Sequence, residues 1–263
     1  MEFAETCALM FCICSFGTLI YSHESPLKHW SLSSAGKSFL MGAAVALTTF
    51  LIIHSPFGRR TGAHFNPAIT ITYFYLDRVH HWDTLHYILS QFAGGLTGVL
   101  LAYEVFGSSL SSAPVSFVIT TPGYFGSLMA FAAEFLLSGL MMGAVLFATN
   151  WRPLAKFSPI VIAGVTVFYY VLCPSISGFS VNPARSFASA FFARVWYGIW
   201  VYFVAPCAGM LAAANLYLRL RGPEQVYCAK IYHDMQSVCP FNCQFYKLPP
   251  MQKQERTIVH KRS

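Results

Sequence analysis

Charged side chains are the scarcest large group of residues in this sequence. Asp, Glu, Lys and Arg together make up 10% of the 263 residues, whereas soluble globular proteins contain about 25%. Hydrophobic residues account for 56% of the chain, and its mean hydropathy is +0.52. So little charge cannot cover a surface exposed to water, which excludes an ordinary soluble domain. The composition therefore predicts an integral membrane protein whose exterior faces lipid.

Acidic residues are rarer than basic ones, with 10 Asp and Glu against 17 Lys and Arg and a net charge of +7. A protein that binds nucleic acid would gather these cations on one face with interleaved aromatic residues. The sequence has no such face, which excludes nucleic acid as a partner. The cations lie instead in connections between apolar runs and near the C-terminus.

The basic connections fall into two sets that predict the orientation in the membrane, because cytoplasmic loops carry an excess of Lys and Arg. The larger set consists of Arg59, Arg60, Arg78, Arg152, Lys156 and the basic segment that begins at Arg219, and the smaller set consists of Lys28, Lys37 and Arg194. This asymmetry predicts that both termini are cytoplasmic, in a plasma membrane or a bacterial inner membrane.

Six apolar runs approach or reach the roughly 20 residues that a helix needs to cross a bilayer. They cover residues 3–21, 39–53, 85–106, 127–149, 160–173 and 197–218. The connection at 107–126 is rich in Ser, Pro and Gly and lacks Lys and Arg, which indicates the extracellular side. The sequence thus predicts an all-α membrane protein with six transmembrane helices.

Two short stretches share one pattern, His64-Phe65-Asn66-Pro67-Ala68 and Ser180-Val181-Asn182-Pro183-Ala184-Arg185. Asn is a strong N-cap and Pro suits the first helical position, so each stretch predicts a helix start. The apolar segment that follows each one is too short to cross a membrane, which indicates a re-entrant half-helix. Three spans and one half-helix per half predict an inverted repeat, formed by about residues 1–115 and 116–221.

With these two motifs in inverted halves, the sequence resembles the aquaporin, or major intrinsic protein, family over about residues 3–221. The resemblance implies a right-handed bundle of six transmembrane helices in which two re-entrant half-helices meet at mid-membrane. It also implies one pore per subunit and assembly as a homotetramer. The implied pore motifs are Asn66, Pro67, Ala68, Asn182, Pro183 and Ala184. No cofactor is expected for a passive channel of this kind.

The two half-helix starts suggest how such a pore selects its solute. Each helix N-terminus carries about half a positive charge, so two of them at one midpoint oppose the passage of cations and protons. The side-chain amides of Asn66 and Asn182 are expected to donate to a single water oxygen there. Irregular backbone at membrane depth must line a cavity, so the loops should supply carbonyl acceptors along the path.

By the same resemblance, the narrowest point on the extracellular side is formed by Arg185, Tyr170, Phe179 and, in the second helix, Ala46. A cation in the first turn of a helix opposes the helix dipole, so Arg185 needs a functional reason; the alternative is an arginine that reaches the outer interface. Phe179 is typical of glycerol facilitators, whereas Ser186 is typical of water-selective members. We expect a water channel, with glycerol or other small neutral solutes as the alternative.

Acidic residues inside membrane spans are costly and mark functional or supporting positions. The sequence Phe131-Ala132-Ala133-Glu134 echoes Phe3-Ala4-Glu5 in the first span. In the family such acids accept hydrogen bonds from the re-entrant loops, so Glu5 and Glu134 are expected to support the pore. Gln91 and His64 are expected to brace the same loops.

The segment 222–263 lies outside the resemblance. Cys228, His233, Cys239 and Cys243 are residue types that bind zinc, but their spacing is irregular. We expect no metal there and a flexible, reduced, basic cytoplasmic tail.

The leading functional hypothesis is a passive channel that conducts water in single file along osmotic gradients. A secondary transporter also uses inverted repeats and broken helices, and a non-transporting membrane scaffold is a third possibility, although it would not require Arg185. An enzyme is not expected, because the sequence offers no nucleophile and base pair and no phosphate-binding loop.

Overall fold

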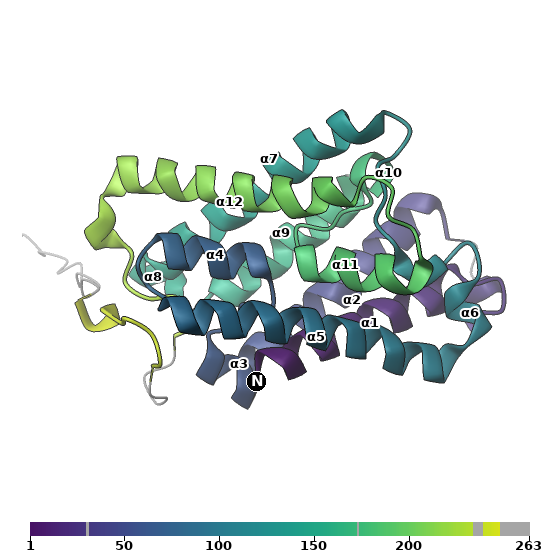
Figure 1. The fold of residues 1–263 in the computed structure, drawn as a ribbon, viewed down its shortest axis with the longest axis horizontal. Helices are drawn as coiled ribbons and strands as arrows, with labels where there is room; N and C mark the ends of the chain where they lie inside the picture. The colour runs from purple at the N-terminus through teal and green to yellow at the C-terminus, as the bar shows by residue number, and fades with distance from the viewer. Residues whose placement is uncertain (30–31, 173, 234–238, 248–263) are drawn as a thin grey trace, which may run out of the picture.

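The computed structural model describes residues 1–29, 32–172, 174–233 and 239–247, and every regular element in these ranges is helical. The elements form a bundle elongated along the direction of its long helices (Figure 1). The prediction of an all-α membrane protein is therefore confirmed.

Five helices are long and apolar enough to cross a membrane, and a sixth is shorter. The five are α1 (Glu2–Tyr21), α2 (Ser34–His54), α5 (His81–Phe106), α7 (Gly126–Thr149) and α12 (Ile199–Arg221). The sixth, α9 (Ser158–Leu172), has 15 residues, or about 22 Å at the usual rise per residue. It covers residues 160–172 of the apolar run expected at 160–173, and the short helix α10 (Pro174–Ser177) begins just beyond that run.

The two half-helices begin where the Asn-Pro pattern predicts. Asn66 is the N-cap of α4 (Pro67–Tyr75), and Asn182 is the N-cap of α11 (Pro183–Ala193). Each Asn side chain accepts from a backbone N–H of the first turn, at 2.9 Å from Ala68 and 3.0 Å from Ala184. Figure 1 shows α4 and α11 end to end along the middle of the bundle, as two half-helices that meet would lie.

Short helices occupy the connections. They are η1 (Pro26–His29), α3 (Pro56–Thr61), α6 (Ser108–Ser111), η2 (Ser116–Val118), α8 (Arg152–Ala155), η3 (Pro223–Gln225) and η4 (Phe245–Lys247). The first five join the spans and half-helices, whereas η3 and η4 lie in the segment that follows α12.

Glycines bring the long helices into close contact at equivalent places in the two halves. A Cβ on Gly94 of α5 would lie 2.2 Å from the carbonyl oxygen of Phe3, and one on Gly209 of α12 would lie 2.1 Å from that of Phe135. Small residues allow this close approach in a bilayer, where apolar burial does not drive helices together. The α1–α5 and α7–α12 pairs thus correspond to each other, as an internal repeat requires.

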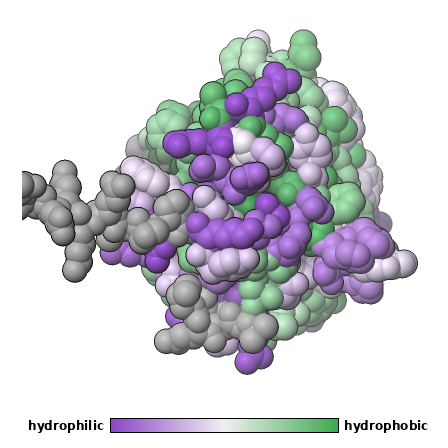
Figure 2. All heavy atoms as spheres, turned by 90° about the vertical axis from the view of Figure 1, so that its left-hand side faces the viewer, coloured by the Kyte–Doolittle hydropathy of each residue, from purple (hydrophilic) through white to green (hydrophobic). Residues whose placement is uncertain are grey.

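The surface divides into apolar flanks and polar ends. On α2, Phe39, Leu47 and Leu51 are each more than half exposed, as expected for side chains in contact with lipid. Figure 2 looks onto one end of the bundle, where hydrophilic residues gather. This distribution fits helices that cross a bilayer from one polar face to the other.

Within residues 222–233 and 239–247, the segment after α12 differs from the flexible tail that the sequence predicts for 222–263; the rest of that tail lies outside the described residues. Residues 226–231 are buried at the end of the bundle, and Phe241 is also buried. The segment turns back from the end of α12 toward α4 and α8 (Figure 1). The burial arises because it bonds to residues far away in sequence, which a local pattern cannot reveal.

Candidate functional site

The loops that precede the two half-helices share an unusual backbone. Ala63 and Phe65 have φ values of 59° and 34°, and Phe179 and Val181 have φ values of 50° and 57°. Non-glycine residues rarely adopt positive φ, and a β-branched residue such as Val181 does so at a cost. The same alternation in both loops indicates that the strain serves to orient peptide groups in the centre of the molecule.

Asn66 and Asn182 bind the two loops to each other. The Nδ2 of Asn66 donates to the carbonyl oxygen of Val181, and the Nδ2 of Asn182 donates to that of Phe65, both at 2.8 Å. An amide carries two N–H groups, so each side chain keeps a second one. The sequence predicts that both amides donate to one water oxygen; in the structure one N–H of each donates to the opposite loop.

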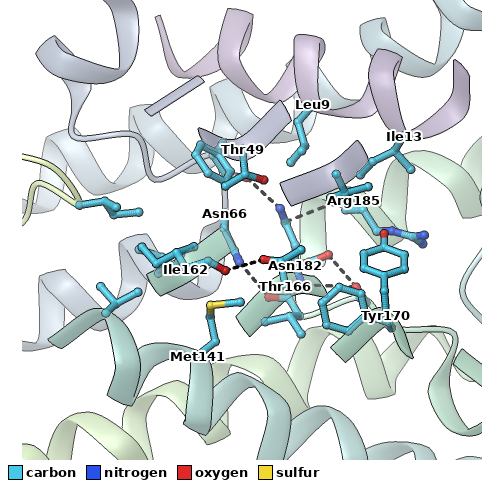
Figure 3. Close-up of a pocket in the computed structure, with 18 residues that line it drawn as sticks. Leu9, Ile13, Thr49, Asn66, Met141, Ile162, Thr166, Tyr170, Asn182 and Arg185 are labelled. Atoms are coloured by element: carbon cyan, nitrogen blue, oxygen red, sulfur yellow. Dashed lines mark hydrogen bonds between the residues drawn. The ribbon is translucent and has the colours of Figure 1, made fainter. Parts of the chain in front are cut away.

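A cavity of about 80 Å³ surrounds this junction. By the usual requirement of about 10–15 Å³ per molecule, it has room for a few waters. Apolar side chains form most of its wall, and its polar groups include the two asparagines and Arg185 as well as hydroxyl-bearing side chains such as Thr49 and Thr166 (Figure 3). Its lining includes Leu9, Ile13, Val45, Thr49, Phe65, Asn66, Ile69, Met141, Val145, Ile162, Thr166, Tyr170, Phe179, Ser180, Val181, Asn182, Arg185 and Ile231. A narrow apolar passage with a few fixed donors and acceptors suits small neutral molecules.

Three of the four residues expected at the constriction lie together. Tyr170 and Phe179 are in ring contact, with centroids 4.6 Å apart, and both line the cavity with Arg185. Arg185 is 3% exposed, and its Nη1 is buried without a hydrogen-bond partner among the described residues. A buried unpaired donor is costly, so this atom is available to a molecule that occupies the cavity.

Ala46 does not lie with the other three. Val45 and Thr49, one helical turn apart, are the α2 residues that face the cavity, and adjacent helical positions point about 100° apart. Gly42 also lies on this side of α2, where a Cβ would come within 2.7 Å of the Tyr170 Cβ. Ala46 is therefore not among the residues that line the cavity.

Carboxylates hold each loop from the adjacent long helix. Glu134 of α7 accepts from the N–H groups of Ser180 at 2.9 Å and Val181 at 2.7 Å. Glu2 of α1 accepts in the same way from His64 at 3.0 Å and Phe65 at 2.8 Å. Each carboxylate thus satisfies two buried loop donors that no helix or strand could pair.

Glu5, which the sequence assigned to this role, contacts a different group. Its Oε1 accepts from the Thr61 hydroxyl at 2.6 Å, and its Oε2 is buried without a partner among the described residues. The dipeptides Glu2-Phe3 and Glu134-Phe135 are the true counterparts, because Phe3 and Phe135 contact equivalent glycines. The sequence signal for Glu2 was this repeated Glu-Phe pair.

Gln91 and His64 lie where bracing was expected. The Nε2 of Gln91 donates to Glu2 at 2.6 Å and to the Thr70 hydroxyl at 3.0 Å. His64 is fully buried, with Nδ1 3.1 Å from Thr70 Oγ1 and Nε2 2.9 Å from the carbonyl oxygen of Ala229. The bond to Ala229 connects the loop before Asn66 to the C-terminal segment.

A second group of residues comes together outside the cavity. The ligand atoms of Cys228, His233, Cys239 and Cys243 all lie within 4.8 Å of one another. Their irregular spacing argued against a site, but the chain folds so that the four converge.

Comparisons with known proteins give the family. The family model described as major intrinsic protein matches residues 1–217. Aquaporin Z of Photorhabdus laumondii is 28% identical over 238 residues, which cover 85% of this chain and 97% of that protein. Probable aquaporin NIP4-2 of Arabidopsis thaliana is 34% identical over 176 residues, which cover 66% of this chain and 60% of that protein.

A solved structure gives the fold independently. The X-ray structure of the aquaglyceroporin from Plasmodium falciparum matches with a TM-score of 0.67 at 22% identity, covering 85% of this chain and 96% of that one. Proteins of this family and the aquaporins among its relatives are channels rather than enzymes. Residues 1–217, with their paired half-helices and central cavity, belong to the major intrinsic protein family.

Proposed function

We propose that the chain is a passive channel that conducts water in single file and excludes ions and protons. The observation that carries this proposal is the cavity around Asn66 and Asn182, where two half-helix N-termini meet. Its apolar wall offers water few competing partners, and the second N–H of each asparagine provides a donor at the centre. The roles of Pro67, Ala68, Pro183 and Ala184 are to start the two half-helices at this point.

Charge exclusion follows from the same arrangement. Each half-helix contributes about half a positive charge at its N-terminus, and Arg185 adds a full charge beside one of them. In a surrounding of low dielectric constant these charges raise a barrier on the order of several kcal/mol for a cation. A neutral molecule meets no such barrier.

A second candidate is a facilitator of glycerol or another small neutral solute. The aromatic pair Tyr170 and Phe179 favours it, because it gives one side of the constriction an apolar face suited to the carbon atoms of a polyol. The relatives named above include both aquaporins and an aquaglyceroporin. Arg185 and the loop carbonyls would bind the hydroxyl groups.

The membrane setting is part of the proposal. The cations at the end of the bundle where the C-terminal segment lies support an orientation with both termini in the cytoplasm. Glu2, Glu134, Gln91 and His64 are proposed to hold the pore loops, and assembly as a homotetramer is proposed from the family resemblance.

Stopped-flow light scattering on proteoliposomes tests the proposal, with gradients of sucrose, glycerol and urea applied in turn. Water permeability well above that of empty liposomes, with little glycerol or urea flux, is the expected result. Rapid glycerol or urea flux would favour the second candidate. Permeability equal to that of empty liposomes for every solute, including with the C-terminal segment released as described below, would refute both.

A further inference from the structure

The C-terminal segment crosses the end of the bundle next to the cavity. Residues 226–231 are each less than a tenth exposed. They bond to Arg78, Asn150, His64, Gly62 and Ser158. These partners come from both repeats, so the segment is held across the bundle rather than against one helix.

Ile231 is the residue of this segment that reaches the cavity. Its N–H donates to the Gly62 carbonyl oxygen at 3.0 Å, and its own carbonyl oxygen accepts from the Ser158 hydroxyl at 2.6 Å. Gly62 precedes the first half-helix, and Ser158 begins α9 in the second repeat. Ile231 lines the same cavity as Asn66 and Asn182, so this segment adds an apolar group to the cavity wall.

Four potential metal ligands flank this residue. Cys228 and His233 lie three residues before and two residues after Ile231, and Cys239 and Cys243 follow. The Sγ atoms of Cys228 and Cys239 are 3.4 Å apart, and His233 Nε2 is 3.2 Å from the Sγ of Cys243. A disulfide has a sulfur separation of about 2.05 Å, so the first pair is not a disulfide.

These separations are close to those around one tetrahedral zinc ion. With bonds of about 2.3 Å to sulfur and 2.0–2.1 Å to nitrogen, the ligand atoms of such a site lie roughly 3.5–3.8 Å apart; the two pairs above are 3.2 and 3.4 Å apart, and no pair of the four exceeds 4.8 Å. Three cysteines and one histidine are a common structural zinc set, closed to further ligands. On binding, each thiol releases its proton to solvent and the imidazole binds in its neutral form.

The surroundings hold the ligands in place. The backbone N–H of Lys230 donates to the Sγ of Cys228 at 3.5 Å, a contact that stabilises a thiolate. The His233 ring stacks on Phe245 at 4.2 Å, nearly parallel. Between the last two cysteines, Phe241 stacks on His64 at 5.5 Å. The cluster is therefore connected to the loop that carries Asn66.

We propose that Cys228, His233, Cys239 and Cys243 bind one zinc ion, which fixes Ile231 over the end of the pore and so restricts permeation. The zinc site stands on the ligand geometry alone, whereas its effect on permeation rests on the proposed channel function. Loss of the metal releases the segment and opens the pore at this end.

Metal analysis of the purified full-length protein tests the site. Protein expressed with zinc and passed through gel filtration should contain one zinc ion per chain. The double variant C239S/C243S should contain none, and the control Cys207→Ser, which changes a partly buried cysteine of α12 away from the cluster, should retain it. Cobalt substitution should give thiolate-to-metal charge-transfer absorption in the parent protein and the control. Absence of metal in the reduced parent protein, or a Cys228–Cys239 disulfide found by mass spectrometry, would overturn the proposal.

Permeability measurements test the consequence. Chelation of zinc, the C239S/C243S double variant and Ile231→Ala should each raise water permeability severalfold over the zinc-loaded protein. Restoring zinc should reverse the effect of chelation but not that of the cysteine variants. Equal permeability with and without bound zinc would overturn the gating role and leave the metal site standing. If the protein binds zinc but shows no water permeability above that of empty liposomes under any of these conditions, the proposed channel function is refuted.

Discussion

At the scale of single residues, the two pore loops depend on carboxylates that approach from neighbouring helices. The N–H groups of these loops are buried at membrane depth, so they need acceptors within the protein. Glu2 and Glu134 provide two such acceptors each, and Glu2 also binds Gln91. Glu5 accepts from one hydroxyl, so the three acids differ in the number of buried donors that they pair.

This difference predicts unequal effects of isosteric substitution. Glu2→Gln places an amide N–H against a backbone N–H of the loop, because a glutamine has only one acceptor oxygen. Hydrogen bonds to charged groups contribute about 1.5–3 kcal/mol each, so Glu2→Gln and Glu134→Gln should each destabilise by roughly that amount and lower water permeability. Glu5→Gln retains an oxygen for Thr61 and should change little. Thermal unfolding in detergent measures the stabilities; equal effects at Glu2 and Glu5 would contradict the assignment.

Arg185 predicts a change of selectivity rather than of stability. Arg185→Val removes a cation from the constriction and widens it, so glycerol and urea permeability and proton leak should rise severalfold. Arg194, at the exposed C-cap of α11, provides the control, and Arg194→Ala should leave selectivity unchanged. Stopped-flow scattering gives the solute fluxes, and a pH-sensitive dye trapped in the vesicles gives the proton leak. If the Arg185→Val channel keeps the selectivity of the parent protein, Arg185 is not part of the selectivity filter.

At the scale of elements, the sequence predicted the features that depend on residues close together in the chain. Both half-helices begin at their predicted N-caps, and the spans follow the apolar runs. Glu5 and Ala46 have other neighbours than the sequence predicts, because a shift of a few residues leaves the local pattern intact while it turns the side chain to another partner. The buried C-terminal segment could not be predicted, since its partners lie far away in sequence and its cysteine spacing is irregular.

Helix packing gives a prediction with an internal control. Gly209→Ala would place a Cβ 2.1 Å from the Phe135 carbonyl oxygen, so α7 and α12 must move apart, at a cost of about 1–3 kcal/mol. Gly143 of α7 has no heavy atom within 4 Å of an added Cβ. Gly143→Ala should be neutral or should stabilise by about 0.5–1 kcal/mol through helix propensity. Thermal unfolding of the two variants in the same detergent tests this prediction. A Gly209→Ala protein as stable as the parent would show that the close contact is not required.

At the scale of the whole molecule, three spans per repeat determine which parts of the chain share a side of the membrane. The connection after α2 and the segment after α12 lie at one end of the bundle, where Ile231 bonds to Gly62. The basic residues Arg59 and Arg219 belong to this end as well. One side of the molecule thus combines these two cations, the C-terminal segment and the cluster of metal ligands.

Positive charge on short loops is retained in the cytoplasm, so this side should be cytoplasmic. In a bacterial host, a green fluorescent protein fused after Ser263 should fluoresce, and alkaline phosphatase fused there should be inactive because it folds only after export. Truncation after Ser112, in a connection without Lys or Arg, should reverse both results, since α5 ends on the opposite side. If the phosphatase fused at the C-terminus is active, the orientation is the opposite one. The zinc ligands then lie outside the cytoplasm, where oxidation would favour a disulfide over a metal site.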